Sequence, residues 1–247
     1  ADALRSLCAQ TGLSSAHVTF CQQDDSSTLT DRGWLPRLGL QFHWTNNGYA
    51  CFDDFLATLS SRKRKAIRRE RRDANAAGLT FSTLCGAAIT PADWQAFYGF
   101  YTDTIDRKWG SAYLTPAFFP LLSERLGDKV VLMLARDGAT PVAAALNLRG
   151  TDTLFGRNWG CRGDWPFLHF ELCYYRAIDF AIANGLTRVE AGAQGEHKIQ
   201  RGYLPVPTHS AHWLENPGLR TAVATFLDAE RADILAQAEA LRALSPY

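Results

Sequence analysis

The sequence predicts an α/β (α+β) fold in which a mixed, mostly antiparallel sheet is flanked by helices. Three short apolar segments, 129–135, 142–148 and 153–159, are joined by tight turns and indicate an antiparallel meander of strands. The segment 168–183 is apolar on nearly all sides and has the length of a buried helix. The short run 187–190, with the β-branched residues Thr187 and Val189, then indicates one more strand, which extends the sheet.

The first 44 residues predict few elements. Residues 2–11 are expected to form a short helix and 15–21 a strand, and the polar stretch 22–31 is expected to be a loop. Residues 38–44 alternate apolar and polar side chains, which is typical of a half-buried strand. Two strands and one helix are too little for an independent domain.

Several helices are marked by their boundary residues. One long helix is expected over 52–77 and is ended by Gly78. Threonine followed by proline at Thr90 and at Thr115 predicts two further helix starts, with the helices running to about residues 108 and 126. After a final strand over 208–214, an amphipathic helix begins near Pro217.

The composition is that of a globular protein, with 47% apolar and 21% charged residues. A net charge of +1 excludes a global field that attracts nucleic acid or membranes, so any such attraction requires a local patch. No apolar run reaches the roughly 20 residues of a membrane-spanning helix. The six cysteines and six histidines have no metal-ligand spacing, so we expect no metal, reduced thiols and a cytoplasmic location.

The predicted helix over 52–77 carries one such local patch. Eight of the eleven residues from Arg62 to Arg72 are basic, and only Glu70 dilutes the charge. This face could be a solvated surface, a contact for RNA or a phosphorylated substrate, or a dock for the phosphates of coenzyme A or a nucleotide-linked substrate. Lys63 projects into the apolar stripe. The predicted phosphate- or RNA-binding residues are Arg62, Lys63, Lys65, Arg68, Arg69 and Arg72.

A glycine-punctuated loop, Gly192 to Tyr203, follows the predicted strand over 187–190. Loops at the end of a rigid strand are common places for chemistry. Three glycines alternate here with titratable and hydrogen-bonding groups, so this loop is the main candidate site. The candidates in and next to it are Glu190, Gln194, Glu196, His197, Lys198, Arg201 and Tyr203.

Other candidates lie on three elements outside this loop. Arg157 is flanked by aromatic side chains on its strand and is either a cation–π filler or an anion-binding side chain. Its neighbours Asn158 and Trp159 are further candidates for substrate contact. His169 and Glu171 lie in the first turn of the buried helix, where a carboxylate is favoured. Two more candidates, at the polar end of the aromatic helix, are Lys108 and Trp109.

The order of elements and several motifs resemble the FemAB-like group of the Gcn5-related N-acetyltransferase (GNAT) superfamily. The motifs are Gln41-Phe42-His43-Trp44, Phe52-Asp53-Asp54-Phe55-Leu56, the basic run 61–71, Arg107-Lys108-Trp109-Gly110, His169-Phe170-Glu171 and the segment 190–198. The resemblance implies a GNAT-like fold. It also implies that residues 1–50 are the remnant of a preceding GNAT-like lobe and that 51–247 form the transferase domain.

The resemblance further implies transfer of an acyl or aminoacyl group from a thioester or an aminoacyl-tRNA to an amine acceptor. In acetyl-CoA users a glycine-rich turn wraps the pyrophosphate, but the corresponding segment 160–167 lacks that signature and contains Asp164. Fem-type transferases use aminoacyl-tRNA, which would suit the basic helix. The alternative is a non-catalytic module that binds RNA or a cell-wall precursor on a degenerate GNAT fold.

Acyl transfer requires a base, a polarised carbonyl and a proton for the leaving group. We expect Glu190, Glu196 or His197 to act as the base, directly or through water, and Tyr203 as the acid. Backbone N–H groups near Trp159 would hold the oxyanion. Anionic parts of the substrate are expected to be anchored by Arg157, Lys198 and Arg201.

Overall fold

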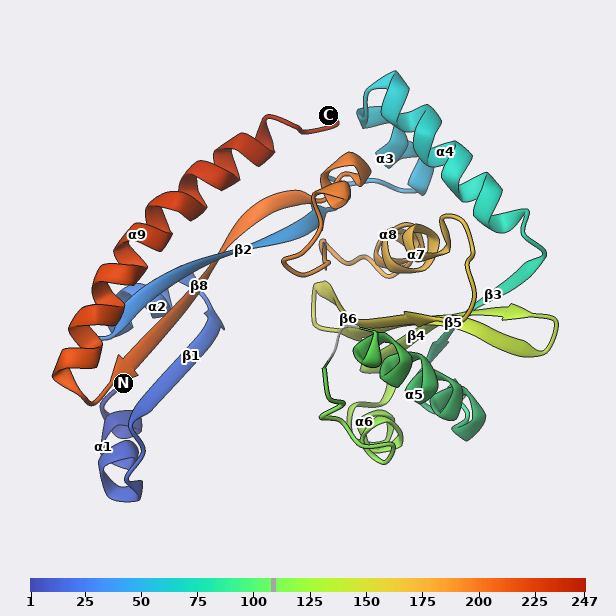
Figure 1. Ribbon diagram of the computed structural model, residues 1–247. Coiled ribbons are helices and arrows are strands. Elements are labelled where there is room, and N and C mark those ends of the chain that lie inside the picture. Colours follow the sequence, from blue (N-terminus) through green and yellow to red (C-terminus); the bar gives the residue numbers. More distant parts are fainter. Residues whose placement is uncertain (108–109) are drawn as a thin grey trace. The chain divides into compact units, whose positions relative to one another are not determined.

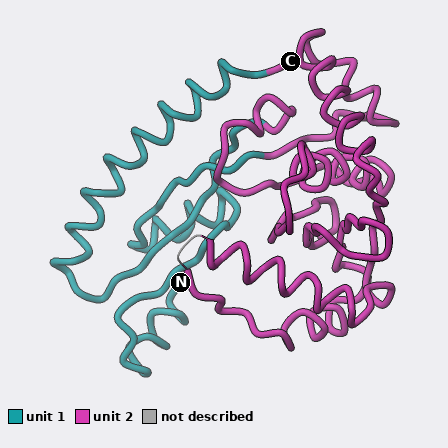
Figure 2. Tube along the Cα trace, turned by 45° about the vertical axis from the view of Figure 1, so that its right-hand side comes forward, with its two compact units in different colours: residues 1–42, 204–245 teal, residues 43–203, 246–247 magenta. Residues whose placement is uncertain are grey.

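The computed structural model describes residues 1–107 and 110–247 of the chain. These residues form two compact units (Figure 2). The first comprises residues 1–42 and 204–245, and the second comprises 43–203 with 246–247. The expectation that residues 1–50 are the remnant of a preceding lobe stays a prediction, but residues 1–42 share a unit with the C-terminal strand and helix.

The first unit is built around three strands, β1 (Ser15–Cys21), β8 (Leu204–Leu214) and β2 (Leu35–Thr45), in the order β1-β8-β2. The last three residues of β2 belong to the second unit. Three helices complete it: α1 (Asp2–Thr11), α2 (Gln23–Thr30) and α9 (Pro217–Arg242). Its core is a small cluster of Cys8, Trp34, Ala211 and Trp213.

Helix α2 corrects the expected loop over 22–31. Its residues are polar, but three hydroxyls bond back to carbonyls one turn earlier, including Ser27 to Gln23 at 3.0 Å and Thr28 to Asp24 at 2.9 Å. The acidic residues Asp24 and Asp25 lie in the first turn, where the helix dipole favours them. Local polar contacts therefore form a helix that hydrophobic periodicity does not reveal.

The second unit contains a sheet in the order β2-β7-β6-β5-β4-β3 (Figure 1). Only the pair β6–β7 is parallel, and the other pairs are antiparallel. The predicted mixed, mostly antiparallel sheet is thus confirmed, including its three-strand meander. The strands are β3 (Leu79–Cys85), β4 (Val130–Asp137), β5 (Thr140–Arg149), β6 (Thr153–Cys161) and β7 (Arg188–Glu190).

Helices cover both faces of this sheet. On one face lie α5 (Pro91–Asp106), which begins at the predicted Thr90 cap, and α6 (Phe118–Leu126), which begins three residues after Thr115. Their aromatic side chains pack on β4 and β5. The other face is covered by the predicted buried helix, which is divided into α7 (Leu168–Phe170), a π-helical turn (Glu171–Tyr175) and α8 (Arg176–Ala183).

The single helix expected over 52–77 is wrong. The chain forms α3 (Phe52–Thr58) and α4 (Ser61–Asn75), separated at Leu59 and Ser60. Leu59 adopts an extended backbone, with ψ 154°, and is only 3% exposed. The Ser60 N–H donates to the carbonyl of Pro246 at 2.8 Å. Burial of Leu59 thus ends one helix and starts the next.

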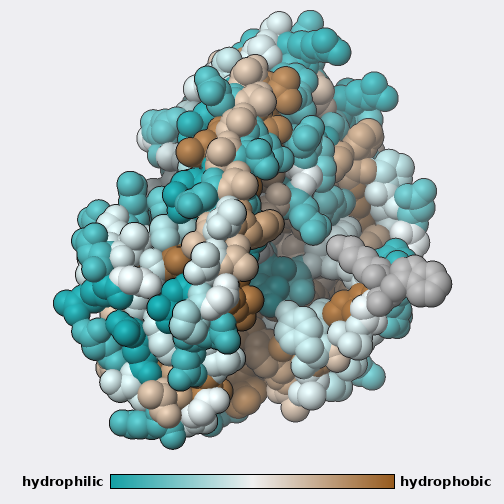
Figure 3. Space-filling view, turned by 60° about the vertical axis from the view of Figure 1, so that its left-hand side comes forward, coloured by the Kyte–Doolittle hydropathy of each residue, from teal (hydrophilic) through white to brown (hydrophobic). Residues whose placement is uncertain are grey.

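The surface of the chain mixes polar and apolar side chains (Figure 3). Exposed apolar residues on α9 include Leu219, Phe226 and Leu235. No helix among the described residues is long and apolar enough to cross a membrane. Three short 3-10 helices complete the elements: η1 (Gly86–Ala88), η2 (Gly127–Lys129) and η4 (Glu196–Arg201).

Candidate active site

The parallel pair β6–β7 ends early, and this end marks the candidate active site. Paired Cα atoms run from Thr153 and Arg188 to Phe155 and Glu190, where β7 stops. Strand β6 continues to Cys161, and no strand of the described residues pairs with that side of it after Phe155. Backbone groups on an unpaired strand edge can hydrogen-bond a ligand.

A β-bulge lies in β6 just beyond this point. The register against β5 shifts between Leu146 and Asn147, so that Arg157 of β6 is the extra residue. Such bulges often occur beside active sites because they redirect side chains. The Arg157 guanidinium donates to the hydroxyl of Tyr113 at 2.7 Å. The side-chain oxygen of Asn158 is buried and has no hydrogen-bond partner among the described residues.

The loop after β7 depends on glycine and on an inward-facing lysine. Gly195 has φ +96°, and a Cβ there would lie 2.8 Å from Nδ1 of His197, so a side chain would displace the imidazole. Lys198 is 5% exposed, and its ammonium donates to the carbonyls of Ala191 and Gly192. Burial lowers the pKa of Lys198 to about 8. The lysine therefore holds the start of the loop from inside.

His197 lies in η4 and is an exposed residue. Its Nε2 lies 2.9 Å from the hydroxyl of Tyr174 in the π-helical turn. Burial, followed by the charges of Arg201 and Lys198, lowers the pKa of His197, so the imidazole is neutral at pH 7. Burial raises the pKa of the Tyr174 phenol, which therefore keeps its proton.

A second neutral imidazole lies next to His197. The ring of His169 is 6.0 Å from that of His197 and 5.1 Å from the indole of Trp159. Burial, with the nearby charges of His197, Lys198 and Arg201, lowers the pKa of His169 to about 4. Trp159 and both histidines, which are candidates from the sequence, thus come together from β6, α7 and η4.

Glu190 ends β7 directly opposite His43 of β2. Oε2 of Glu190 is 3.8 Å from Nε2 of His43, which is 6% exposed. Burial, and then the charge of Arg188, lowers the pKa of His43 to about 4. Burial raises the pKa of Glu190 despite the opposing charge of Arg188. A carboxyl group with a raised pKa is a stronger base than an ordinary surface carboxylate.

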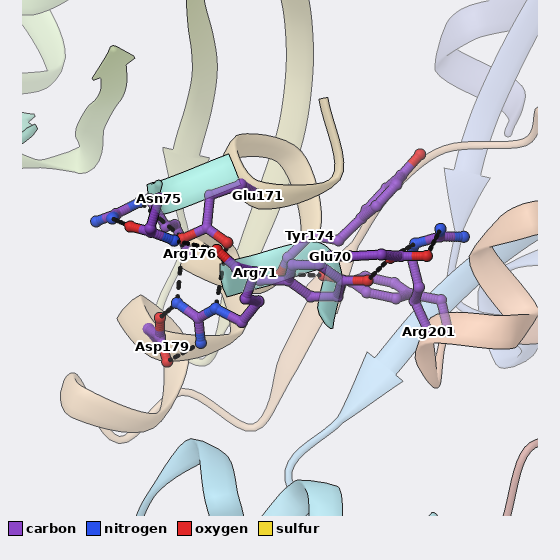
Figure 4. A network of polar contacts seen from close by, with 10 residues as sticks. Glu70, Arg71, Asn75, Glu171, Tyr174, Arg176, Asp179 and Arg201 are labelled. Carbon is purple, nitrogen blue, oxygen red and sulfur yellow. Dashed lines mark hydrogen bonds and ion pairs between the residues drawn. The ribbon is translucent and has the colours of Figure 1, made fainter. Parts of the chain in front are cut away.

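A network of ion pairs connects helix α4 with the candidate site (Figure 4). Glu70 accepts two hydrogen bonds from Arg201, with distances of 2.7 and 3.1 Å, and one from the hydroxyl of Tyr175. Arg201 also donates to the carbonyl of His197 at 2.8 Å. Its guanidinium lies 3.4 Å from the ring centroid of Phe170. Arg201 is thus bound by groups of this chain.

The other half of the network surrounds Glu171, which is completely buried. Arg71 binds it through two nitrogens at 3.2 Å, and Arg176 lies 3.1 Å away. Arg71 also pairs with Asp179 at 2.6 Å. A buried carboxylate needs such partners because its desolvation is costly. These contacts give Glu171 a role in joining α4 to the π-helical turn.

Tyr203 is also fully buried. Its hydroxyl donates to the carbonyl of Tyr174 at 3.1 Å, and burial raises its pKa well above the usual range. A π-helical turn shifts the normal hydrogen-bond ladder of a helix, and Tyr203 satisfies one carbonyl there. The Tyr203 hydroxyl is therefore committed to this carbonyl and is not suited to give a proton to a leaving group.

The basic side chains of α4 lie mainly on its exposed side. Arg69 and Arg72 are each 71% exposed and share Asp73. Arg68 pairs with Asp53 at 2.9 Å and is also exposed. Arg62 and Lys65 are exposed, whereas Lys63 is half-buried at the edge of the packed face.

Four predicted residues remain, of which two lie on the loop. Gln194 and Glu196 are exposed on the loop itself. Lys108 and Trp109 lie outside the described residues. No group of three or more potential metal ligands is found in residues 1–107 and 110–247.

The comparison with protein families shows which family this chain belongs to. A family model for FemAB-like proteins, described as peptidoglycan biosynthesis/recognition, matches residues 1–247. The chain belongs to the FemAB-like family. The predicted resemblance is thereby confirmed over the whole chain. No curated protein matches this sequence.

Solved structures with a similar fold are distant in sequence from this FemAB-like chain. A C-terminal domain of a putative lysylphosphatidylglycerol synthetase from Agrobacterium fabrum has a TM-score of 0.62 at 12% identity, covering 92% of this chain and 77% of that one. L-PGS from Bacillus licheniformis gives 0.65 at 11%, with coverages of 92% and 76%. FemX gives 0.64 at 10%, with coverages of 90% and 77%. The predicted GNAT-like fold is confirmed, and FemX is among the structures that share it.

Sequence reasoning about this FemAB-like chain missed three residues of the site. Tyr174 was treated only as part of an apolar helix, and His43 only as part of a strand and a motif. Glu70 was noted only because it dilutes the basic run. For Tyr174 and Glu70 the available signal was a polar group on a helix face otherwise expected to be packed, where it requires a partner. His43 lies on the polar side of its strand and carried no such signal.

Proposed function

We propose that this FemAB-like protein is an aminoacyltransferase that moves an aminoacyl group from aminoacyl-tRNA to an amine on a peptidoglycan precursor. The observation that carries the proposal is the neutral imidazole of His197, bound by Tyr174 and exposed on the loop that follows β7. A neutral imidazole is the form that can accept a proton at pH 7.

The reaction would need one proton to move in two steps. The acceptor amine attacks the ester carbonyl carbon, a C–N bond forms, and His197 takes the amine proton. The C–O bond to the tRNA ribose then breaks, and the imidazolium returns the proton to that oxygen. Backbone N–H groups of β6 near Trp159 would stabilise the oxyanion between these steps. Glu190, with its raised pKa, is the second candidate base.

Two observations favour tRNA over an acyl-CoA donor. The segment 160–167 offers one arginine, Arg162, and this side chain is 3.3 Å from Asp103. The same segment contains the exposed Asp164, which would repel a pyrophosphate. Helix α4, in contrast, exposes a row of arginine and lysine side chains suited to a polyanion. Acetyl-CoA is therefore the second donor to be tested.

The experiment offers both donors to the full chain. One reaction contains total tRNA charged with radiolabelled amino acids, and a parallel one contains radiolabelled acetyl-CoA. The acceptor is a soluble UDP-muramoyl-pentapeptide, with phosphatidylglycerol vesicles as a second acceptor. We expect label to move from tRNA to the peptide. Label moving only from acetyl-CoA, or only to the lipid, would contradict the proposed donor or acceptor.

A non-catalytic binding module is the second candidate function. The observation that favours it is that three predicted site residues, Glu171, Arg201 and Tyr203, are used inside the protein. Such a module would bind the tRNA or the muramoyl peptide with measurable affinity and transfer no label over many hours. Equilibrium binding measured beside the transfer assay separates the two functions.

A further inference from the structure

Glu70 is the acidic exception in the basic run of α4, and its side chain points away from the exposed basic face. It is 16% exposed and pairs with Arg201, whose side chain is 9% exposed. Two parallel hydrogen bonds join the carboxylate and the guanidinium. Bidentate pairs of this kind fix geometry more strictly than a single contact does.

Arg201 transmits this contact to the loop. Its Nε and one terminal nitrogen bind Glu70, and the other terminal nitrogen donates to the carbonyl of His197. Stacking on Phe170 further restricts the plane of the guanidinium. Arg201 thus links helix α4, through Glu70, to the backbone of His197.

Two polar contacts consequently hold His197. Arg201 holds its backbone carbonyl, and the Tyr174 hydroxyl holds its ring at Nε2. Gly195 leaves the space that the ring occupies. If the backbone contact is lost, the position of the imidazole on this glycine-rich loop depends on the Tyr174 hydrogen bond and on the ring contacts with Phe170 and His169 alone.

We propose that Glu70 is a positioning residue for His197, acting through Arg201. This inference rests on the proposed function for its effect on transfer, but its structural part can be measured without turnover. Displacements of about 1 Å in a reacting group can lower the rate roughly 100-fold. The variant Glu70→Gln keeps the size of the side chain and removes its charge.

The test compares wild type, Glu70→Gln and Asp53→Asn in the full chain. Asp53 is the matched control because its carboxylate also pairs with an α4 arginine, Arg68, on the exposed side. With charged tRNA and the muramoyl pentapeptide, Glu70→Gln should lower kcat roughly 10- to 100-fold and change KM by less than about threefold. Asp53→Asn should leave both parameters near the wild-type values.

The second readout is the titration of His197 followed by NMR, with amide hydrogen exchange across residues 192–203. Glu70→Gln should make exchange faster and should shift the titration of His197, because release of the loop changes both the solvation of the ring and its distance from the Arg201 charge. Unchanged titration and exchange would overturn the inference. If both change while wild type transfers no label, the positioning role holds and the proposed function fails.

A second variant keeps the test informative if Glu70→Gln is unable to fold. If Glu70→Gln does not fold, Arg201→Lys replaces it, because it keeps the positive charge and loses the bidentate geometry. The same shift in His197 is expected for this variant, and its absence would equally overturn the inference. Glu70→Asp retains the charge and should recover part of the lost kcat.

Discussion

Replacing His43 with glutamine should make the protein less sensitive to acid. His43 is 6% exposed, and its pKa is lowered from 6.5 to about 4. The unfolded chain therefore binds a proton near pH 6.5, whereas the folded chain binds it only near pH 4. Between these values falling pH favours the unfolded state, so stability present above pH 6.5 is lost on acidification.

The size of this stability change follows from the lowered pKa of His43. About 2.5 pH units at about 1.4 kcal/mol per unit give about 3 kcal/mol from this one histidine. Wild type should lose that amount between pH 6.5 and pH 4 in addition to the contributions of other groups. His43→Gln should lose about 3 kcal/mol less over the same range, whatever its stability at pH 8.

The assay is urea unfolding of the full chain followed by circular dichroism at several pH values. Glu190→Gln is the matched control from the same strand pair. Its raised pKa has the opposite sign, because the folded carboxyl group keeps its proton at a higher pH than the unfolded one. Glu190→Gln should therefore steepen the acid loss. Equal losses in wild type and His43→Gln would refute the reasoning.

Two further predictions concern packing and RNA binding. Gly160→Ala should destabilise the protein by about 1–3 kcal/mol in the same unfolding assay, because a Cβ would lie 2.6 Å from the backbone carbon of Phe100; an unchanged midpoint would contradict this close approach. Arg69→Glu with Arg72→Glu should weaken tRNA binding and lower the slope of log K against log salt by about 1 per lost phosphate contact. Arg125→Glu, an exposed arginine on α6, should leave that slope unchanged, and equal slopes in all three proteins would exclude α4 as the RNA surface.

The sheet could be predicted from the sequence because its signals are local. Alternation of side chains marked β2, and tight turns marked the meander of β4, β5 and β6. The start of α5 was predicted because threonine at Thr90 is followed by proline at the first helical position, and the structure adds a capping box between Thr90 and Asp93. Helix α2 was missed because its polar composition is that of a loop, and the hydroxyl contacts that stabilise the helix leave no periodic pattern in the sequence.

The candidate site could be predicted only in part. Its loop was found because glycines and titratable groups are concentrated in one short segment. The partners of that loop come from distant segments: Glu70 binds Arg201, and Tyr174 binds His197. No single-sequence pattern pairs such residues. For the same reason Arg201 and Tyr203 were expected to face a substrate, while the structure shows them bound to groups of the chain itself.

The central claim is that His197 takes part in aminoacyl transfer. It is tested most directly by single-turnover transfer of label from charged tRNA to the muramoyl pentapeptide, with wild type, His197→Ala and His209→Ala compared. We predict that His197→Ala slows the transfer at least about 100-fold, as removal of a general base does. His209→Ala, in the first unit, should transfer at the wild-type rate. Equal rates for wild type and His197→Ala would contradict the claim.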